Sequence, residues 1–234
     1  MCGKTPDVAA MQDLLVYVTK GLSEVTTKLR ELGEEISPDD NHRVTFNLFI
    51  TITNASFDRE SIAARIKDTL ECKKRLLTKL DKLCGEKGRK YSLSDAAVWD
   101  GDESEYDEKA KKESVLSTKD EDVRSLRQLI TYGVKGMSAY SKHANALMKE
   151  APEIDAFIQR ALAATLDDSV TVDELVALAL ETGEYGVKVM SFLDAANTGA
   201  YGNPEMTRVN IGVRNNPGIL VSGHDLRDLE MLLE

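Results

Sequence analysis

Cysteine is scarce in this chain, which has only three in 234 residues. Cys2, Cys72 and Cys84 are odd in number and widely spaced, so they do not form the paired framework of a small disulfide-rich secreted domain. A chain of this length buries about 70% of the surface that its unfolded form exposes, and it needs neither disulfides nor a structural metal to fold. We therefore expect reduced thiols and a cytoplasmic location.

Long apolar runs and basic patches are also missing. No stretch approaches the roughly 20 continuous apolar residues that cross a bilayer, and the first residues form no apolar signal region, so we expect no membrane association. The 30 basic and 40 acidic side chains give a net charge of −10. Because binding to a phosphate backbone depends on clustered lysine and arginine, we expect no nucleic-acid partner.

Apolar residues that recur every three or four positions predict a first set of three helices, in a bundle at about residues 5–86. The first helix, at 6–32, has Thr5 as a candidate cap and Gly33 at its end. Residues 43–54 are rich in β-branched side chains and suit either a strand or a buried helix, and the helical segments on both sides favour a helix. Residues 58–83 form the third helix.

A second set of helices is predicted in a bundle at about residues 120–199. Between the two sets, residues 87–119 are rich in charged and small side chains, which indicates a solvated linker with one exposed helical stretch near 104–112 and Trp99 as its large apolar anchor. The helices expected are 121–149, 152–165 and one from about 172 toward 197, which Thr171 and Glu174 open with a capping box.

A weak internal repeat links the two sets of helices. Tyr, Lys, Gly and Ser recur with the same spacing 115 residues apart, at Tyr17, Lys20, Gly21 and Ser23 and again at Tyr132, Lys135, Gly136 and Ser138. A shorter echo joins residues 132–138 to 185–191. Two interpretations are open: duplicated bundles packed side by side, or small and aromatic residues recurring wherever helices pack closely.

The sequence changes character after Gly199. Turn-forming residues lead into the short apolar runs 209–213 and 219–221, and an amphipathic stretch begins at Leu226. This order predicts that residues 206–234 open an incomplete α/β, Rossmann-like domain behind a helical domain at 1–205. The predicted fold class is therefore mainly α, with two three-helix bundles followed by the first strands and helix start of a truncated α/β domain.

His224 and Cys2 are the candidate metal ligands. His224 stands between a predicted strand and a helix, at the sheet edge where ligands bind in open α/β folds, although a purely local capping role also suits it. Cys2 precedes a helix whose dipole would stabilise a thiolate, although a lone cysteine satisfies no ligand spacing and its position alone favours a terminal cysteine without a role.

The other cysteines and histidines suggest structural roles. Cys72 and Cys84 lie 12 positions apart on one predicted helix, about 120° around its axis, and so cannot form a ligand pair on one face. His143 is expected to pack within its helix. His42 falls in a predicted polar loop, and we assign it no role.

A series of short motifs occurs in order along essentially the whole chain. They are CGKTP at 2–6 with LL at 14–15, TITN at 51–54, YGVKG at 132–136, DAANTG at 194–199, YGNPE at 201–205, VNIGV at 209–213 and, above all, GILVSGHDL at 218–226. Taken together, these motifs resemble the hybrid-cluster (prismane) proteins, the hydroxylamine reductase family.

The resemblance implies two α/β domains after the helical domain, of which this chain holds only the beginning. It also implies two metal clusters. Cys2 matches the last of four cysteines that bind an N-terminal iron–sulfur cluster, and His224 matches the histidine ligand of a hybrid iron–sulfur–oxygen cluster. The other ligands would lie before Met1 and beyond Glu234, so we expect neither cluster to be complete in this chain.

The activity that the resemblance implies is reduction of hydroxylamine to ammonia and water, with nitric oxide reduction as a related possibility. Hydroxylamine or another small nitrogen species would be the substrate, and an electron-donor protein would be the partner. We expect this chain to be a fragment that is inactive alone. The alternatives are a cluster-free helical scaffold or subunit-interaction module, and a subunit whose missing ligands come from a separate chain.

Overall fold

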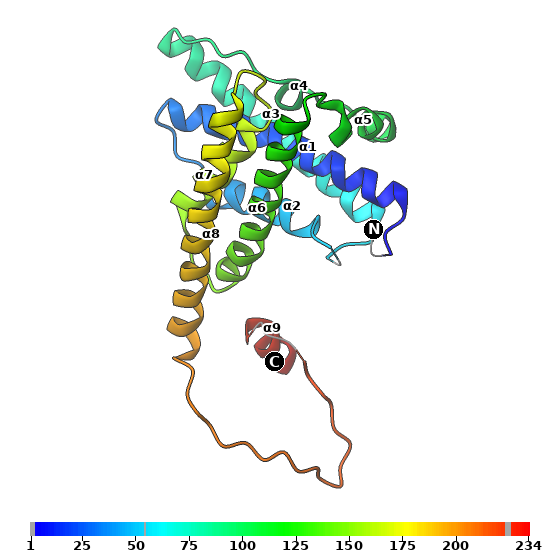
Figure 1. Ribbon diagram of the computed structural model, residues 1–234, viewed down its shortest axis with the longest axis vertical. Helices are drawn as coiled ribbons and strands as arrows, with labels where there is room; N and C mark the ends of the chain where they lie inside the picture. The colour runs from blue at the N-terminus through cyan, green and yellow to red at the C-terminus, as the bar shows by residue number, and fades with distance from the viewer. Residues whose placement is uncertain (1–2, 54, 223–225) are drawn as a thin grey trace.

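The structure is a computed structural model that describes residues 3–53, 55–222 and 226–234, and these residues are mainly helical (Figure 1). Two sets of three helices carry most of the chain: α1 (Pro6–Glu31), α2 (Pro38–Ile50) and α3 (Arg59–Lys87), then α6 (Glu121–Ala146), α7 (Pro152–Ala164) and α8 (Val172–Tyr201). Between the sets lie α4 (Asp95–Val98), α5 (Tyr106–Lys112) and two 3-10 turns, Glu103–Glu105 and Val115–Ser117. Helix α9 (Leu226–Leu233) follows near the end of the chain.

Local capping residues explain where several helices begin and end. The capping box predicted for α8 is confirmed, because the Glu174 backbone N–H donates to Thr171 Oγ1 at 3.3 Å and the Thr171 N–H donates to Glu174 Oε2 at 2.8 Å. The helix predicted from residue 43 is confirmed as part of α2, which ends at Ile50 and begins earlier than expected because Ser37 caps it ahead of a proline. Gly88, with a φ of 63°, ends α3 in the left-handed conformation that favours glycine.

The two sets of helices have matching lengths. Helices α1 and α6 each have 26 residues, α2 and α7 each have 13, and α3 and α8 have 29 and 30. The starts of α1 and α6 are 115 residues apart, which is the offset of the repeated sequence motif. This agreement favours a duplicated helical unit over chance recurrence of small and aromatic residues.

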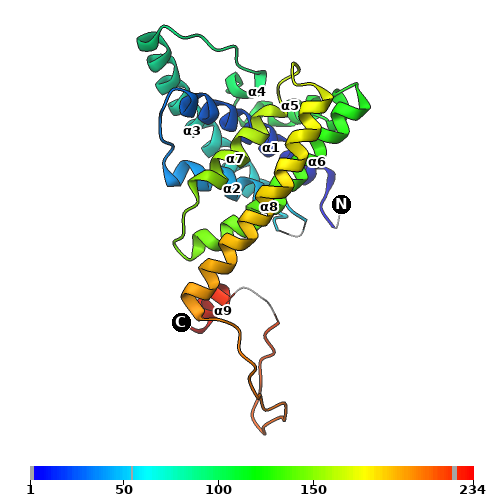
Figure 2. The ribbon, with the colours of Figure 1, turned by 60° about the vertical axis from the view of Figure 1, so that its left-hand side comes forward.

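The sets do not pack as two independent bundles. Helix α1 packs along α3 and also along α7, while α6 packs along α8 and also along α2 (Figure 2). The short helix of each set therefore lies against the long first helix of the other. One apolar core joins both sets, with Val25 of α1, Leu76 of α3, Ile130 of α6, Phe157 of α7 and Leu175 of α8 among its members. The domain boundaries inferred from sequence stay a prediction.

The segment expected to be a solvated linker contributes to a second apolar core. Tyr106 and Ala110 of α5 are buried against the first halves of α1 and α3, and Trp99 packs against the same cluster. The ammonium of Lys73, only 1% exposed on α3, donates to the backbone oxygens of Ala96 at 2.7 Å and Trp99 at 2.6 Å. Apolar burial and these hydrogen bonds hold residues 95–110 against the first helical set.

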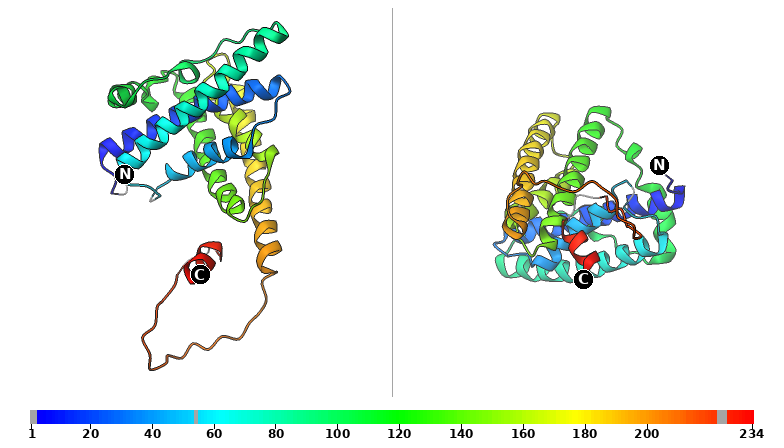
Figure 3. Two further views of the ribbon diagram at one scale, coloured as in Figure 1. Left: turned by 180° about the vertical axis from the view of Figure 1, so that it is seen from behind. Right: turned by 90° about the horizontal axis from the view of Figure 1, so that it is seen from below.

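The strands predicted at 209–213 and 219–221 are absent from the described residues, so that prediction is wrong for this structure. Residues 202–222 are exposed throughout and run away from the end of α8 as an extended segment (Figure 3). A strand needs a neighbouring strand to pair its backbone N–H and C=O groups, and the described chain offers none to this segment. The helix expected from Leu226 is present as α9, and Tyr201 donates to Glu230 Oε2 at 2.9 Å.

None of the helices in the described residues combines the length and the apolar character that a membrane span requires.

Candidate functional site

The two predicted metal ligands, Cys2 and His224, lie outside the described residues. The segment directly after Cys2 is fixed by side chains. Lys4 donates from Nζ to Gln12 Oε1 at 2.9 Å and to the Ile52 backbone oxygen at 3.1 Å. Gln12 in turn donates from Nε2 to the backbone oxygens of Ile50 and Ser56, each at 3.2 Å. These contacts hold the start of the chain against the loop between α2 and α3.

Within the described ranges, no three His, Cys, Asp or Glu side chains are grouped so that they could hold a metal ion. The exposed segment ending at Ser222 and the helix starting at Leu226 flank His224 without adding such a group. The described side chains therefore add no further group of candidate ligands to Cys2 and His224.

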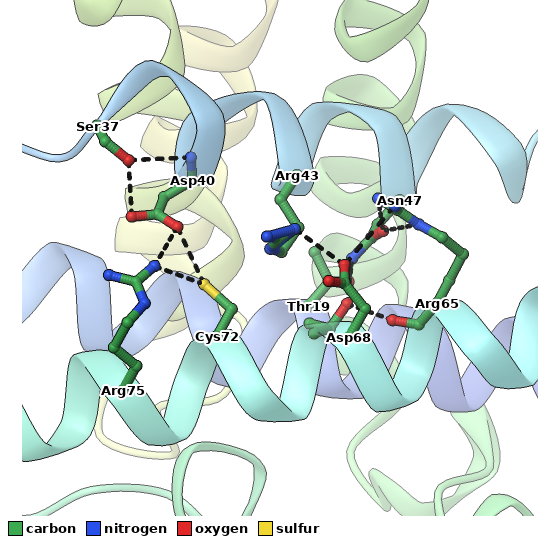
Figure 4. Close-up of polar contacts among 10 residues, drawn as sticks. Thr19, Ser37, Asp40, Arg43, Asn47, Arg65, Asp68, Cys72 and Arg75 are labelled. Carbon is green, nitrogen blue, oxygen red and sulfur yellow. Dashed lines mark hydrogen bonds and ion pairs between the residues drawn. The ribbon is translucent and has the colours of Figure 1, made fainter.

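Cys72 has a structural environment, as the sequence predicted (Figure 4). Its Sγ donates to Asp40 Oδ1 at 3.1 Å, and Arg75 Nη2 donates to the same oxygen at 2.5 Å. Burial, together with the hydrogen bond to the Asp40 carboxylate and its charge, raises the pKa of the Cys72 thiol to about 12. Cys72 therefore stays protonated near neutral pH, which makes it a poor metal ligand and nucleophile. Cys84 is half-buried further along α3.

A second buried polar group in Figure 4 joins α1, α2 and α3. Asn47 Nδ2 donates to Thr19 Oγ1 at 3.1 Å and to Thr69 Oγ1 at 2.8 Å, and Asn47 Oδ1 accepts from Arg65 Nη2 at 3.0 Å. The amide thus uses both its donor and its acceptor side on protein partners. This network fixes the packing of the three helices.

The described histidines also contact neighbouring helices and loops. His42 lies on α2, which corrects the loop predicted for it, and its Nε2 lies 2.9 Å from Glu150 Oε2. The capping residue Ser37 explains the difference, because it starts the helix before His42. The ring of His143 packs edge-on against Phe49 with 6.0 Å between centroids, as expected for a packed helix residue.

A polar pocket of about 240 Å³ lies between α1 and α6 and was not anticipated from composition. Both copies of the repeated Tyr-x-x-Lys motif line it, as Tyr17 and Lys20 on α1 and as Tyr132 and Lys135 on α6. Arg127, which is 9% exposed, lines it as well. The internal repeat marked four of the residues that line this pocket. The sequence alone did not show that the two copies of the motif face one another.

Positive charge exceeds negative charge in this pocket. Removal from water, and then the charges of Arg127 and Lys135, lower the pKa of Lys20 from 10.5 to about 8. Loss of water also lowers the pKa of Lys135, while Asp13 opposes that change. The described part of the chain provides no hydrogen bond or ion pair to the ammonium of Lys20 or Lys135.

The described residues thus define a helical protein of two matching, interlocked sets of three helices, in which the described thiols and histidines have structural contacts. The chain belongs to the Prismane/CO dehydrogenase family, whose family model matches residues 1–234. This match confirms the resemblance to prismane proteins drawn from the short motifs.

Similar proteins carry the name hydroxylamine reductase. The chain is 55% identical over 235 residues to that of Desulfovibrio desulfuricans, 53% over 256 residues to that of Clostridium tetani and 52% over 238 residues to that of Clostridium perfringens. Each alignment covers 100% of this chain but only 42%, 45% and 42% of the relative. The chain therefore spans less than half the length of these relatives.

Proposed function

We propose that this chain supplies the helical part of an iron–sulfur oxidoreductase that reduces hydroxylamine to ammonia and water. The observation that carries this proposal is similarity along the whole chain to proteins named hydroxylamine reductase, at 55% identity in one case. The reaction consumes two electrons and two protons for each hydroxylamine, and it cleaves the N–O bond. A separate electron-donor protein would supply the electrons, and nitric oxide is a related candidate substrate.

Within this proposal, Cys2 is a ligand of an N-terminal iron–sulfur cluster and His224 is a ligand of a hybrid iron–sulfur–oxygen cluster. When bound, such clusters supply electron transfer and the site of reduction, and the protein supplies ligands and electrostatics. Lys4 and Gln12 would position the segment that carries Cys2, because they tie the adjacent backbone to the α2–α3 loop. Each cluster has one candidate ligand in this chain, so we expect the 234 residues alone to be inactive.

A chimera with a relative provides the test. The chain would replace the matching region of the Desulfovibrio desulfuricans hydroxylamine reductase, so that the rest of that protein supplies the remaining ligands. After anaerobic assembly with iron and sulfide, the chimera should form ammonia from hydroxylamine with a reduced viologen dye as electron donor. The isolated 234-residue chain should form none under the same conditions.

Single substitutions in the chimera test the two ligands. His224→Ala should abolish ammonia formation and alter the iron spectrum, whereas Cys2→Ser should mainly impair electron entry from the dye. His42→Ala is the matched control, since His42, on α2, pairs through its ring with Glu150 and has no role in the proposed clusters, and it should leave turnover within about twofold. A folded, iron-loaded chimera without turnover would refute the proposed reaction. Unchanged iron content and turnover in both ligand variants would favour the helical scaffold instead.

A further inference from the structure

The pocket between α1 and α6 is lined by more basic than acidic side chains, and two of its lysines have no ion pair among the described residues. Four basic and two acidic side chains line it: Lys20, Arg124, Arg127 and Lys135 against Asp13 and Glu113. Glu113 already pairs with Lys109 at 2.9 Å, outside the lining of the pocket. Asp13 is thus the remaining acid for two lysines that have no ionic partner of their own. The chain as a whole has a net charge of −10, so this local excess of positive charge runs against its overall charge. Such a pocket attracts anions.

Arg127 lines the same pocket and is held in place by partners on the neighbouring loop. Its Nη2 donates to the Asp167 backbone oxygen at 2.8 Å and to Asp168 Oδ1 at 2.9 Å, which fixes the guanidinium. Its Nε is buried and has no hydrogen-bond partner among the described atoms. The fixed guanidinium therefore places a positive group at the wall of the pocket beside Lys20.

We propose that the α1–α6 pocket binds a phosphate group, with Lys20 and Lys135 facing it from the two repeated motifs and the guanidinium of Arg127 at its wall. A phosphate carries up to two negative charges near neutral pH and several acceptor oxygens, which suits two lysines and one guanidinium. The volume of about 240 Å³ leaves room for either free phosphate or a small phosphate monoester. This site is separate from the proposed clusters, so its test does not depend on them.

Calorimetric titration of the full 234-residue chain tests the proposal. Inorganic phosphate and phenyl phosphate would be titrated at constant ionic strength, with chloride as the balancing anion. We expect one saturable site per chain, and Lys20→Met or Lys135→Met should each weaken phosphate binding about tenfold or more. Tighter binding of phenyl phosphate would identify a monoester as the ligand, and tighter binding of inorganic phosphate would identify the free ion.

Lys149→Met is the matched control, because it removes the same charge from an exposed position outside the pocket. It should leave the dissociation constant within about twofold. Lys20→Arg keeps the charge and should retain binding, so it distinguishes loss of charge from loss of fold. Absence of saturable binding to the parent chain, or equal weakening by Lys149→Met, would overturn the proposal.

Proton uptake gives a second readout. Because the pKa of Lys20 is lowered to about 8, a bound anion should raise it, and binding near pH 8 should draw protons from the buffer. Titrations in buffers with different ionisation enthalpies measure that uptake. The charged and titratable groups that face Lys20 from the surrounding elements are Asp13, Tyr17, Glu113, Arg124, Arg127, Tyr132 and Lys135. Uptake should fall in Lys20→Met and persist in Lys149→Met, and equal uptake in both would refute the assignment to Lys20.

Discussion

At the residue scale, two glycines in equivalent positions of the repeat have opposite surroundings. A Cβ on Gly21 of α1 would lie 1.9 Å from the backbone oxygen of Ala96, whereas a Cβ on Gly136 of α6 would meet no atom within 4 Å. Gly21→Ala should therefore lower the free energy of unfolding by about 1–3 kcal/mol, because the backbone of α4 must move. Gly136→Ala should raise it by about 0.5–1 kcal/mol, since alanine favours helix. Urea denaturation measures both, and effects of the same sign would contradict the packing described.

Asp155 gives a prediction in the pH dependence of stability. The side chain is 3% exposed on α7, its Oδ2 has no partner among the described atoms, and burial, more than neighbouring charges, raises its pKa from 3.8 to about 6. The folded protein thus keeps this proton between pH 3.8 and 6 while the unfolded chain loses it, so Asp155 makes stability fall as pH rises through that window.

Asp155→Asn should remove this effect. We expect the variant to be more stable than the parent near neutral pH, with a gain about 2 kcal/mol larger at pH 7.5 than at pH 4.5. Urea unfolding of both proteins at the two pH values measures the difference. Asp81→Asn removes an exposed carboxylate from the later part of α3 and is the control with which the Asp155→Asn variant is compared. A gain that does not change with pH would show that Asp155 is ionised in the folded state.

At the scale of elements, the docking of residues 95–110 depends on Lys73. Its ammonium donates to two backbone oxygens, those of Ala96 and Trp99, and Lys73→Met would leave both without this donor. We expect a loss of about 1–3 kcal/mol in unfolding free energy and a red shift of Trp99 fluorescence as this segment loosens. Lys74→Met is the neighbouring control: its surface ion pair with Asp100 should contribute less than about 1 kcal/mol. An unchanged Trp99 spectrum in Lys73→Met would mean that the other contacts of this segment hold it without Lys73.

The same scale shows which features were predictable from sequence. Helix ends followed local chemistry, as at Thr171 with Glu174 and at Gly33, because caps and left-handed glycines act within a few residues. The burial of α5 was missed, since its sequence is charged along most of its length and two residues, Tyr106 and Ala110, make its apolar contact. The prediction of strands at 209–213 and 219–221 was wrong because strand pairing depends on partners distant in sequence, which a local pattern does not show.

For the candidate sites too, the sequence identified individual residues but not the residues that pack around them. The repeat marked Lys20 and Lys135 but gave no reason to place them opposite one another, because only the packing of α1 and α6 around a common pocket does so. Cys2 and His224 were selected by motifs, and their environment lies outside the described residues. The 12-residue spacing between Cys72 and Cys84 was enough to predict a structural role for Cys72. Its hydrogen-bond partner Asp40 could not be inferred, because it lies on another helix.

At the scale of the whole molecule, the short helix of each set packs on the long first helix of the other set. The two sets should therefore unfold together. Helix α7 packs against α1, and polar contacts reinforce the joint: Arg30 Nη1 donates to Gln159 Oε1 at 2.7 Å, and Gln159 Nε2 donates to Asn41 Oδ1 at 2.9 Å. Neither set can bury its share of the common apolar core without the other. Separate folding of the two bundles would leave large apolar faces in water.

Equilibrium unfolding in urea tests this coupling. Trp99, the single tryptophan, packs against the core of the first set, while far-UV ellipticity reports all the helices. We expect the two signals to change at the same urea concentration, as in a two-state transition. Residues 1–201 alone should keep that midpoint, because residues 202–222 are exposed, whereas residues 1–119 alone should fail to unfold cooperatively for lack of α6 and α7. A Trp99 transition separated from the ellipticity change, or a cooperative 1–119 fragment, would show that the first set is an independent bundle.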